Sequence, residues 1–225
     1  MSTVDERLSF LSYVYLKITP EDLRNTNNPD IVKKIIGQCS YRAYQDLKRR
    51  VPYEYSSNAV EKLDENTKTE FRKKKEKFLT EIYETINNNL TDDKGMFKKI
   101  INPREIIEDV IIVGKKNQAV FKNDKNFTVG LAQKWVNMTL KYLWILGVVD
   151  AASEAELEVP IDSYILEELC ELGLDVKYIK WSTWNDFLKY VEIQEELKKI
   201  ITNEFQTRIA WENEAWIKVA EMKKQ

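Results

Sequence analysis

The chain has 225 residues, of which 43% are apolar and 32% charged, a balance that allows a sizeable core and excludes intrinsic disorder. Six glycines and five prolines are too few for a turn-rich β-sandwich or a Rossmann enzyme, and the absence of histidine excludes imidazole chemistry and His-ligated zinc. The formal net charge of −2 creates no overall field that would steer the protein to nucleic acid, although a local basic patch is compatible with it.

The length allows one domain or a tight pair, at roughly 100–200 residues per domain, and the chain has no internal repeat or low-complexity linker. We therefore predict a single compact all-α domain over 1–225. Cys39 and Cys170 show no CxxC spacing and are expected to be reduced thiols that fill the core, with a disulfide between them as the alternative. The first ten residues do not resemble a signal peptide, and the most apolar stretch, 135–149, is interrupted by polar residues. We expect a cytoplasmic protein without a membrane partner.

Two helices are predicted in the first fifty residues. Apolar residues at three- and four-residue spacing indicate an amphipathic helix over 4–18, closed by Pro20. Asn28 followed by Pro29 is typical of a helix start, because the asparagine caps the helix and proline is tolerated in its first turn. This second helix should run to about Arg50.

The middle of the chain is more polar. The pattern over residues 59–90 predicts one long polar helix, or two. The basic run at 72–75 within it is compatible with a solvated helix face or with a strip of phosphate contacts. A second Asn-Pro pair, at 102–103, predicts a helix over 104–113 that Gly114 ends.

A helix over 131–146 is apolar on nearly every face, so we expect it to be central and buried. An acidic loop over 151–158 follows it and leads to a short helix over 163–172. Each of these two helices is followed directly by a glycine, which is typical of a helix end. Ser182 is expected to begin the C-terminal helices.

Two residues could carry chemistry. Lys134 falls near the start of the buried helix, where apolar neighbours and the positive end of the helix dipole both favour its neutral, nucleophilic amine. Asp162 directly precedes the short helix that follows, and Pro160 restricts the approach of the chain. Both residues also have a purely structural interpretation, as a lysine that extends along apolar surface and as a plain helix cap.

The segment 129–134 reads Val-Gly-Leu-Ala-Gln-Lys, and the segment 160–165 reads Pro-Ile-Asp-Ser-Tyr-Ile. These segments resemble the hairpin and the aspartate motif of the helix-hairpin-helix (HhH-GPD) DNA glycosylases, with alanine for the second hairpin glycine and tyrosine for a histidine. The separation between lysine and aspartate is similar to that of the archaeal 8-oxoguanine DNA glycosylase (AGOG) branch. The resemblance covers about 127–187 and implies a helical array of that type.

The resemblance implies a function in DNA repair. Lys134 would attack the sugar of an extruded nucleotide and expel an oxidised or modified base, and the resulting imine would permit strand cleavage. Asp162 would keep the amine active and stabilise positive charge on the sugar. Gln38 would fill the gap left by the base or touch it. The implied partner is duplex DNA with a modified base, and no cofactor or metal is implied.

The resemblance also implies further DNA contacts. The backbone amides of Gly130, Leu131 and Ala132 would hold a phosphate at the start of the buried helix. Trp181 or Trp184 would stack on the extruded base, although tryptophans in such helices also serve as core or interface anchors.

The alternative is a non-catalytic all-α module, either a degenerate relative of the glycosylases or an unrelated protein. Such a module would bind a protein partner through surfaces rich in tyrosine and tryptophan, for example in phage–host defence or regulation. A glycosylase requires the lysine and the aspartate to face each other across a cleft with a positive rim. The candidates for that rim are Arg42, Lys48, Arg49 and Arg50.

Overall fold

The computed structural model describes residues 3–201 and 207–223, and within these ranges the chain is helical and contains no strand. The elements in chain order are α1 (Thr3–Leu16), α2 (Pro20–Arg24), α3 (Pro29–Leu47), α4 (Ser57–Val60), α5 (Glu65–Leu90), α6 (Pro103–Lys116), η1 (Gln118–Val120), α7 (Val129–Ile145), α8 (Ala151–Glu154), α9 (Ser163–Glu171), η2 (Trp181–Thr183), α10 (Phe187–Ile200) and α11 (Arg208–Met222). The all-α prediction is confirmed. The more specific glycosylase arrangement remains a prediction.

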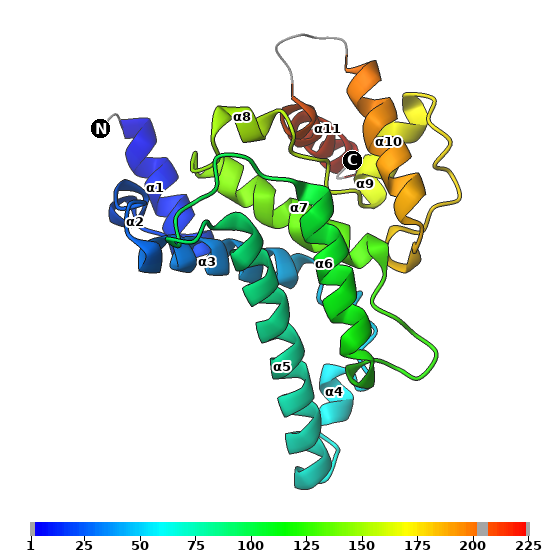
Figure 1. Cartoon of the computed structure of the whole chain (residues 1–225). Coiled ribbons are helices and arrows are strands. Elements are labelled where there is room, and N and C mark those ends of the chain that lie inside the picture. The colour runs from blue at the N-terminus through cyan, green and yellow to red at the C-terminus, as the bar shows by residue number, and fades with distance from the viewer. Residues whose placement is uncertain (1–2, 202–206, 224–225) are drawn as a thin grey trace.

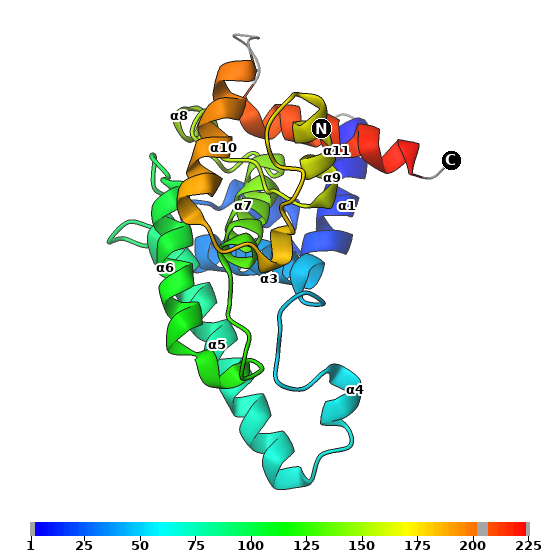
Figure 2. The same ribbon diagram turned by 90° about the vertical axis from the view of Figure 1, so that its right-hand side faces the viewer.

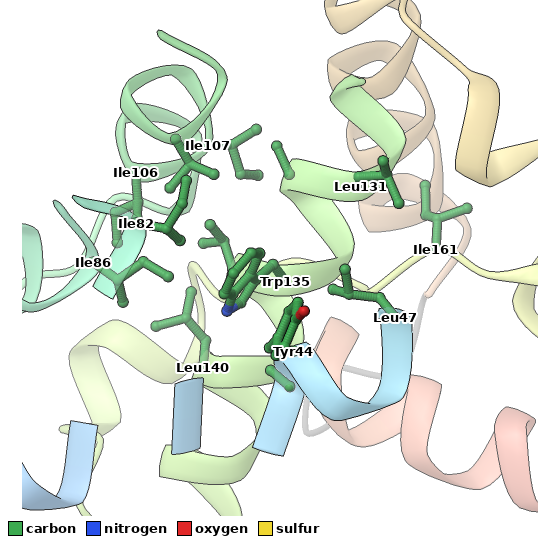
Figure 3. Close-up of a cluster of buried hydrophobic side chains, with 14 of the residues drawn as sticks. Tyr44, Leu47, Ile82, Ile86, Ile106, Ile107, Leu131, Trp135, Leu140 and Ile161 are labelled. Carbon is green, nitrogen blue, oxygen red and sulfur yellow. The ribbon is translucent and has the colours of Figure 1, made fainter. Parts of the chain in front are cut away.

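Helix α7 lies in the middle of the fold, packed against α3 and α6, while α9 and α11 pack together on another side of it (Figure 1). Its Trp135 is fully buried among apolar side chains from α5 and α6, including Ile82 and Ile106 (Figure 3). The ring of Trp135 stacks on Tyr44 of α3 at 5.0 Å between centroids, and its indole N–H donates to the Ser40 carbonyl at 3.1 Å. The prediction that this helix is central and buried is confirmed.

The polar segment predicted as one helix or two forms two helices of unequal length. The short α4 is followed by a turn, and Asp64 then caps α5 by accepting from the amides of Asn66 and Thr67. The N-terminal half of α5 extends beyond the rest of the fold, with α4 beside it (Figures 1 and 2).

Local signals placed several helix ends correctly. Asn28 and Asn102 cap α3 and α6 through their side-chain oxygens, as the two Asn-Pro pairs predict. Gly147 and Gly173 follow α7 and α9 with positive φ angles of 69° and 86°, which glycine adopts without steric cost. Helix α1 ends at Leu16, just before Lys17, which also has a positive φ.

Gly114 does not end its helix, because α6 continues to Lys116. A Cβ at Gly114 would lie 2.5–2.8 Å from atoms of Phe127, so this glycine provides room for a packed ring within the helix. The prediction that both cysteines fill the core is confirmed only in part. Cys39 is buried and Cys170 is exposed, and both are free.

Two further boundaries differ from the prediction. The acidic segment contains the short helix α8, capped by Asp150. The C-terminal helices begin at Phe187, where Asp186 accepts from the amide of Lys189, whereas Ser182 lies in the single 3₁₀ turn η2. Among the described residues, no helix combines the length and the apolar character needed to cross a bilayer.

Candidate functional site

Lys134 lies on the second turn of α7, in a stretch where every residue from Val129 to Asn137 is buried. The helix begins at Val129 because Thr128 caps it, with its hydroxyl accepting from the amide of Leu131 at 3.2 Å. The side chain of Lys134 is 8% exposed. A buried ammonium requires close hydrogen-bond partners, since burial of an unpaired charge is costly.

Asp162 supplies the main partner of that amine. Its Oδ2 accepts from Lys134 Nζ at 2.7 Å, and the carbonyl of Pro160 accepts from the same amine at 3.4 Å. The other carboxylate oxygen, Oδ1, caps α9 by accepting from the amides of Tyr164 and Ile165. Burial alone would raise the pKa of Asp162, but the charge and hydrogen bond of Lys134, together with the two amides, lower it below its usual value.

Two buried glutamines hold the extended segment that leads to Asp162. Gln133 of α7 accepts from the amide of Ile161 at 3.0 Å and donates to its carbonyl at 2.7 Å. Gln194 of α10 makes the same pair of bonds with Val159, at 3.1 and 2.9 Å. Both backbone groups of these two residues are therefore satisfied by side chains, as a neighbouring strand would satisfy them. We call Gln133 and Gln194 the glutamine clamp.

A second lysine–carboxylate pair lies on the same helix. Lys141 of α7 donates to Oε2 of Glu212 of α11 at 2.6 Å, and the two side chains are 10% and 1% exposed. The other oxygen of Glu212, Oε1, is buried and has no hydrogen-bond partner among the described residues. Burial raises the pKa of Glu212, and the charge of Lys141 offsets this only in part.

Both pairs line one pocket of about 570 Å³. Five cationic side chains and three carboxylates line it, so its wall has a positive balance although the whole chain is slightly negative. The charged lining residues are Arg42, Asp46, Arg49, Arg50, Lys134, Lys141, Asp162 and Glu212, and Trp181, Trp216 and Tyr142 supply aromatic surface. Three of the four arginines and lysines proposed for a positive rim therefore lie at this pocket, and Lys48 lies elsewhere.

The structure brings together only some of the predicted DNA-contact residues. Trp181 lines the pocket next to Lys134 and Asp162. Trp184 is not among the lining residues and instead packs edge-on against Tyr190, with 6.2 Å between ring centroids. Gln38 is half-buried on α3 and also lies outside the pocket lining. Trp216, predicted as a core or interface anchor and not as a site residue, donates its indole N–H toward Asp162 at 3.4 Å.

The first amides of α7 are bonded within the chain. The amide of Gly130 donates to the carbonyl of Trp184 at 2.9 Å, and the amides of Leu131 and Ala132 donate to Thr128. A Cβ at Gly130 would lie 1.5 Å from the carbonyl oxygen of Trp181. The close backbone approach at this glycine is therefore made by the segment around η2. A phosphate contact by these amides stays a prediction and would require their present partners to move.

The acidic segment between the two motifs does not line this pocket. Glu158 is buried, accepts from Arg104 at 2.7 Å and from the hydroxyl of Tyr190 at 2.6 Å, and lies 3.5 Å from Arg208. Glu156 and Glu158 line a separate pocket. The carboxylate of Glu158 is thus buried with partners from other helices and does not face the pocket that holds Lys134. Within the described ranges, no group of acidic and thiol side chains is placed to hold a metal ion.

Sequence reasoning missed Lys141, Glu212 and the role of Gln133. A signal existed for Lys141, because it is a second lysine seven positions after Lys134 in an otherwise apolar helix. Gln133 directly precedes Lys134, so it lies on a different face and could be expected to serve a different partner. No local pattern distinguishes Glu212 from the other acidic residues of α11.

Comparison of this chain with protein-family models, with curated proteins and with solved structures found no match. The site is therefore argued from its own geometry.

Proposed function

We propose that this protein is a DNA glycosylase that removes an oxidised or modified base through Lys134, with accompanying AP-lyase activity. The observation that carries the proposal is the 2.7 Å contact between Lys134 Nζ and Asp162 Oδ2 at the wall of a pocket lined by Arg42, Arg49 and Arg50. A nucleophilic amine, a carboxylate and a cationic surface for phosphates are the groups that this reaction needs.

The pocket has the size and the walls for an extruded nucleotide. Its volume of about 570 Å³ lies in the range of small-molecule sites. Trp181 and Trp216 provide flat apolar surface next to the amine, and aromatic rings commonly stack on bases taken out of the helix. An intact duplex would present the sugar carbon out of reach, so extrusion must precede the reaction.

In the proposed reaction, Lys134 first releases one proton to solvent water at the pocket, which leaves Asp162 ionised, and then attacks the anomeric carbon as a free amine. The bond from that carbon to the base breaks, and the base leaves with a proton from the attacking nitrogen. Opening of the sugar ring gives an imine between Lys134 and the sugar, from which β-elimination cleaves the strand. Asp162, whose pKa is lowered, stays anionic and stabilises the positive charge that develops on the sugar.

The second pair supports recognition of the base. Glu212 Oε1 is a buried acceptor without a partner among the described residues, and it belongs to a residue that lines the pocket. Because this oxygen is buried, the side chain of Glu212 must shift before a base that presents N–H donors can satisfy it, whereas a base without such donors would leave it unpaired. Lys141 holds the carboxylate in place through Oε2.

Borohydride trapping on duplexes that carry 8-oxoguanine or an abasic site tests the proposal. We expect a covalent adduct with the natural chain and none with Lys134→Gln. On the abasic duplex, which has no base to be recognised, Lys141→Gln is the matched control, because it removes a lysine of similar burial from the same helix and pocket without removing the nucleophile. An adduct of equal yield in Lys134→Gln, or no adduct with the natural chain on any such duplex, would refute the proposal.

A second candidate function is protein binding, and the surface of α1 favours it. Large apolar side chains there are exposed, including Phe10 at 67% and Tyr15 at 61%. Scattered exposure of this kind is common, but a cluster on one helix is typical of an interaction surface. Substitution of Phe10 and of Leu11, which is 48% exposed on the same helix, by serine should then abolish association with the partner and leave borohydride trapping unchanged.

A further inference from the structure

Residues of the segment that leaves α3 and passes to α4, together with residues of α5, line a second pocket of about 530 Å³. Figure 2 shows the course of the chain between α3 and α4. Its lining includes five cationic side chains and no carboxylate, and the five are Lys48, Arg49, Arg50, Lys75 and Lys122. Arg49 and Arg50 also line the pocket that holds Lys134 and Asp162. The two pockets are therefore joined by a shared cationic border.

The cations of this pocket differ from their neighbours on α5. Lys68, Arg72, Lys74 and Lys77 of that helix each form an ion pair with a glutamate of the same region. Among the described residues, none of the five cations at the second pocket forms an ion pair. The basic run at 72–75 is thus divided: Arg72 and Lys74 are neutralised at the surface, and Lys75 is directed to the pocket without a counter-ion.

Lys75 is the most enclosed of these groups. Its amine lies over the ring of Tyr53 at 4.5 Å, and the hydroxyl of that buried tyrosine lies 3.0 Å from the hydroxyl of Tyr44. Burial, with the nearby charge of Lys48 as a further cause, lowers the pKa of Lys75. Like charges gathered in a partly enclosed pocket repel each other, and a bound anion relieves that repulsion.

We propose that this second pocket binds phosphate groups of a nucleic-acid strand that continues from the first pocket. This inference rests on the proposed function for the direction of the strand. Cationic side chains that have no carboxylate paired with them within the protein are the groups that exchange counter-ions for phosphates. Arginine suits this role at the border between the pockets, because its planar guanidinium donates to two phosphate oxygens at once. The arm formed by α4 and α5 thereby extends the contact beyond the extruded nucleotide.

Binding of undamaged duplex DNA, measured by fluorescence anisotropy over a series of salt concentrations, tests this inference. The test variant is Lys48→Gln/Lys75→Gln/Lys122→Gln. The matched control is Lys94→Gln/Lys115→Gln/Lys199→Gln, which removes the same charge from exposed sites outside both pockets. We expect the test variant to bind about tenfold or more weakly. The slope of log affinity against log salt concentration should fall by about 2.7, which is about 0.9 for each of the three charges removed. The control should change the affinity by less than about threefold.

The outcomes separate this inference from the proposed function. Equal losses of duplex affinity in the test and control variants would overturn the phosphate site at the second pocket, even if borohydride trapping succeeds. Failure of trapping together with a selective loss in the test variant would refute the chemistry and retain the phosphate site. The test variant could instead lose binding of pyrophosphate and keep its affinity for the duplex. That result would overturn the nucleic-acid strand as the ligand and indicate a small phosphate compound. The double variant Lys48→Gln/Lys122→Gln, at two exposed positions, provides the same comparison if the triple variant fails to fold.

Discussion

Lys134 and Lys141 lie two turns apart on α7, and each donates to a carboxylate of another helix. Lys134 donates to Asp162 at the start of α9, and Lys141 donates to Glu212 within α11. One buried helix therefore places two ammonium groups in one pocket. The environments of the two carboxylates differ. Asp162 receives two backbone amides in addition to its lysine, whereas Glu212 has one oxygen without a partner among the described residues, and the pKa shifts of the two acids have opposite directions.

Asp162→Asn should separate the two roles of this residue. Asparagine is a good helix cap, so its oxygen retains the hydrogen bonds to the amides of α9. It loses the charge and the acceptor for Lys134, because its second terminal atom is a donor nitrogen. We expect the rate of base release under single-turnover conditions to fall about 100-fold or more. Asp162→Ala should lose the cap as well, so its free energy of unfolding in urea should be about 1 kcal/mol lower than that of Asp162→Asn. Equal free energies of unfolding for the two variants would contradict a stabilising role of residue 162 as the cap of α9.

The dependence of stability on pH should reflect the opposite shifts of the two acids. The pKa of Asp162 is lowered on folding, so its contribution is complete above its usual value of 3.8 and is lost as the pH falls through the folded value. The pKa of Glu212 is raised, so its contribution is complete below its usual value of 4.5 and is lost as the pH rises through the folded value. Urea unfolding of Glu212→Gln and of the natural chain from about pH 3 to 7 checks this. The variant should gain stability relative to the natural chain as the pH rises above 4.5, and a constant difference would contradict the shift.

Gly130→Ala should be strongly destabilising, because its Cβ would lie 1.5 Å from the carbonyl oxygen of Trp181. The segment around η2 would have to move, and Trp181 would leave its place at the pocket. We expect the free energy of unfolding to fall by at least about 2 kcal/mol. Gly37→Ala is the matched control, since a Cβ there meets nothing within 4 Å and the position lies inside α3. That control should gain about 0.5–1 kcal/mol from helix propensity alone.

The glutamine clamp predicts that its two members differ in their effect on activity. Gln133→Leu leaves the buried amide and carbonyl of Ile161 without partners. Gln194→Leu leaves the buried amide of Val159 without a partner and its carbonyl with only the donor Nδ2 of Asn137, at 3.3 Å. Each variant should lose about 2–4 kcal/mol of stability. Gln133 holds the residue next to Asp162, so its variant should also lower the single-turnover rate at a temperature where both variants are folded. Equal rates for the two variants would limit Gln133 to a structural role.

Much of the fold follows from short-range signals. The caps at Asn28 and Asn102, the glycines after α7 and α9, and the burial of α7 are all determined by residues within a few positions of one another. Gly114 misleads for the same reason. Its neighbours in sequence indicate a helix end, whereas the contact that explains it comes from Phe127, in a different segment.

The site divides in the same way. The resemblance drew attention to Lys134 and Asp162 as a pair, and the structure brings them into contact. Lys141 and Glu212 pair across 71 positions, and no local pattern links them. The approach of the Trp181 carbonyl to Gly130 is also long-range, and no local pattern indicates it. Such contacts depend on the packing of whole helices.

The glutamine clamp has a consequence for how this arrangement should be sought in other chains. Glutamine side chains from α7 and α10 fix the position of Asp162, because they hydrogen-bond to the backbone of residues just before it. These hydrogen bonds do not depend on the length of the connection after α7. Insertions or deletions in this connection would change the spacing of lysine and aspartate along the chain without changing their distance in space. A glutamine directly before a buried lysine, followed at any interval by an apolar-proline-apolar-aspartate segment, is therefore a better search pattern than a fixed interval between the two charged residues.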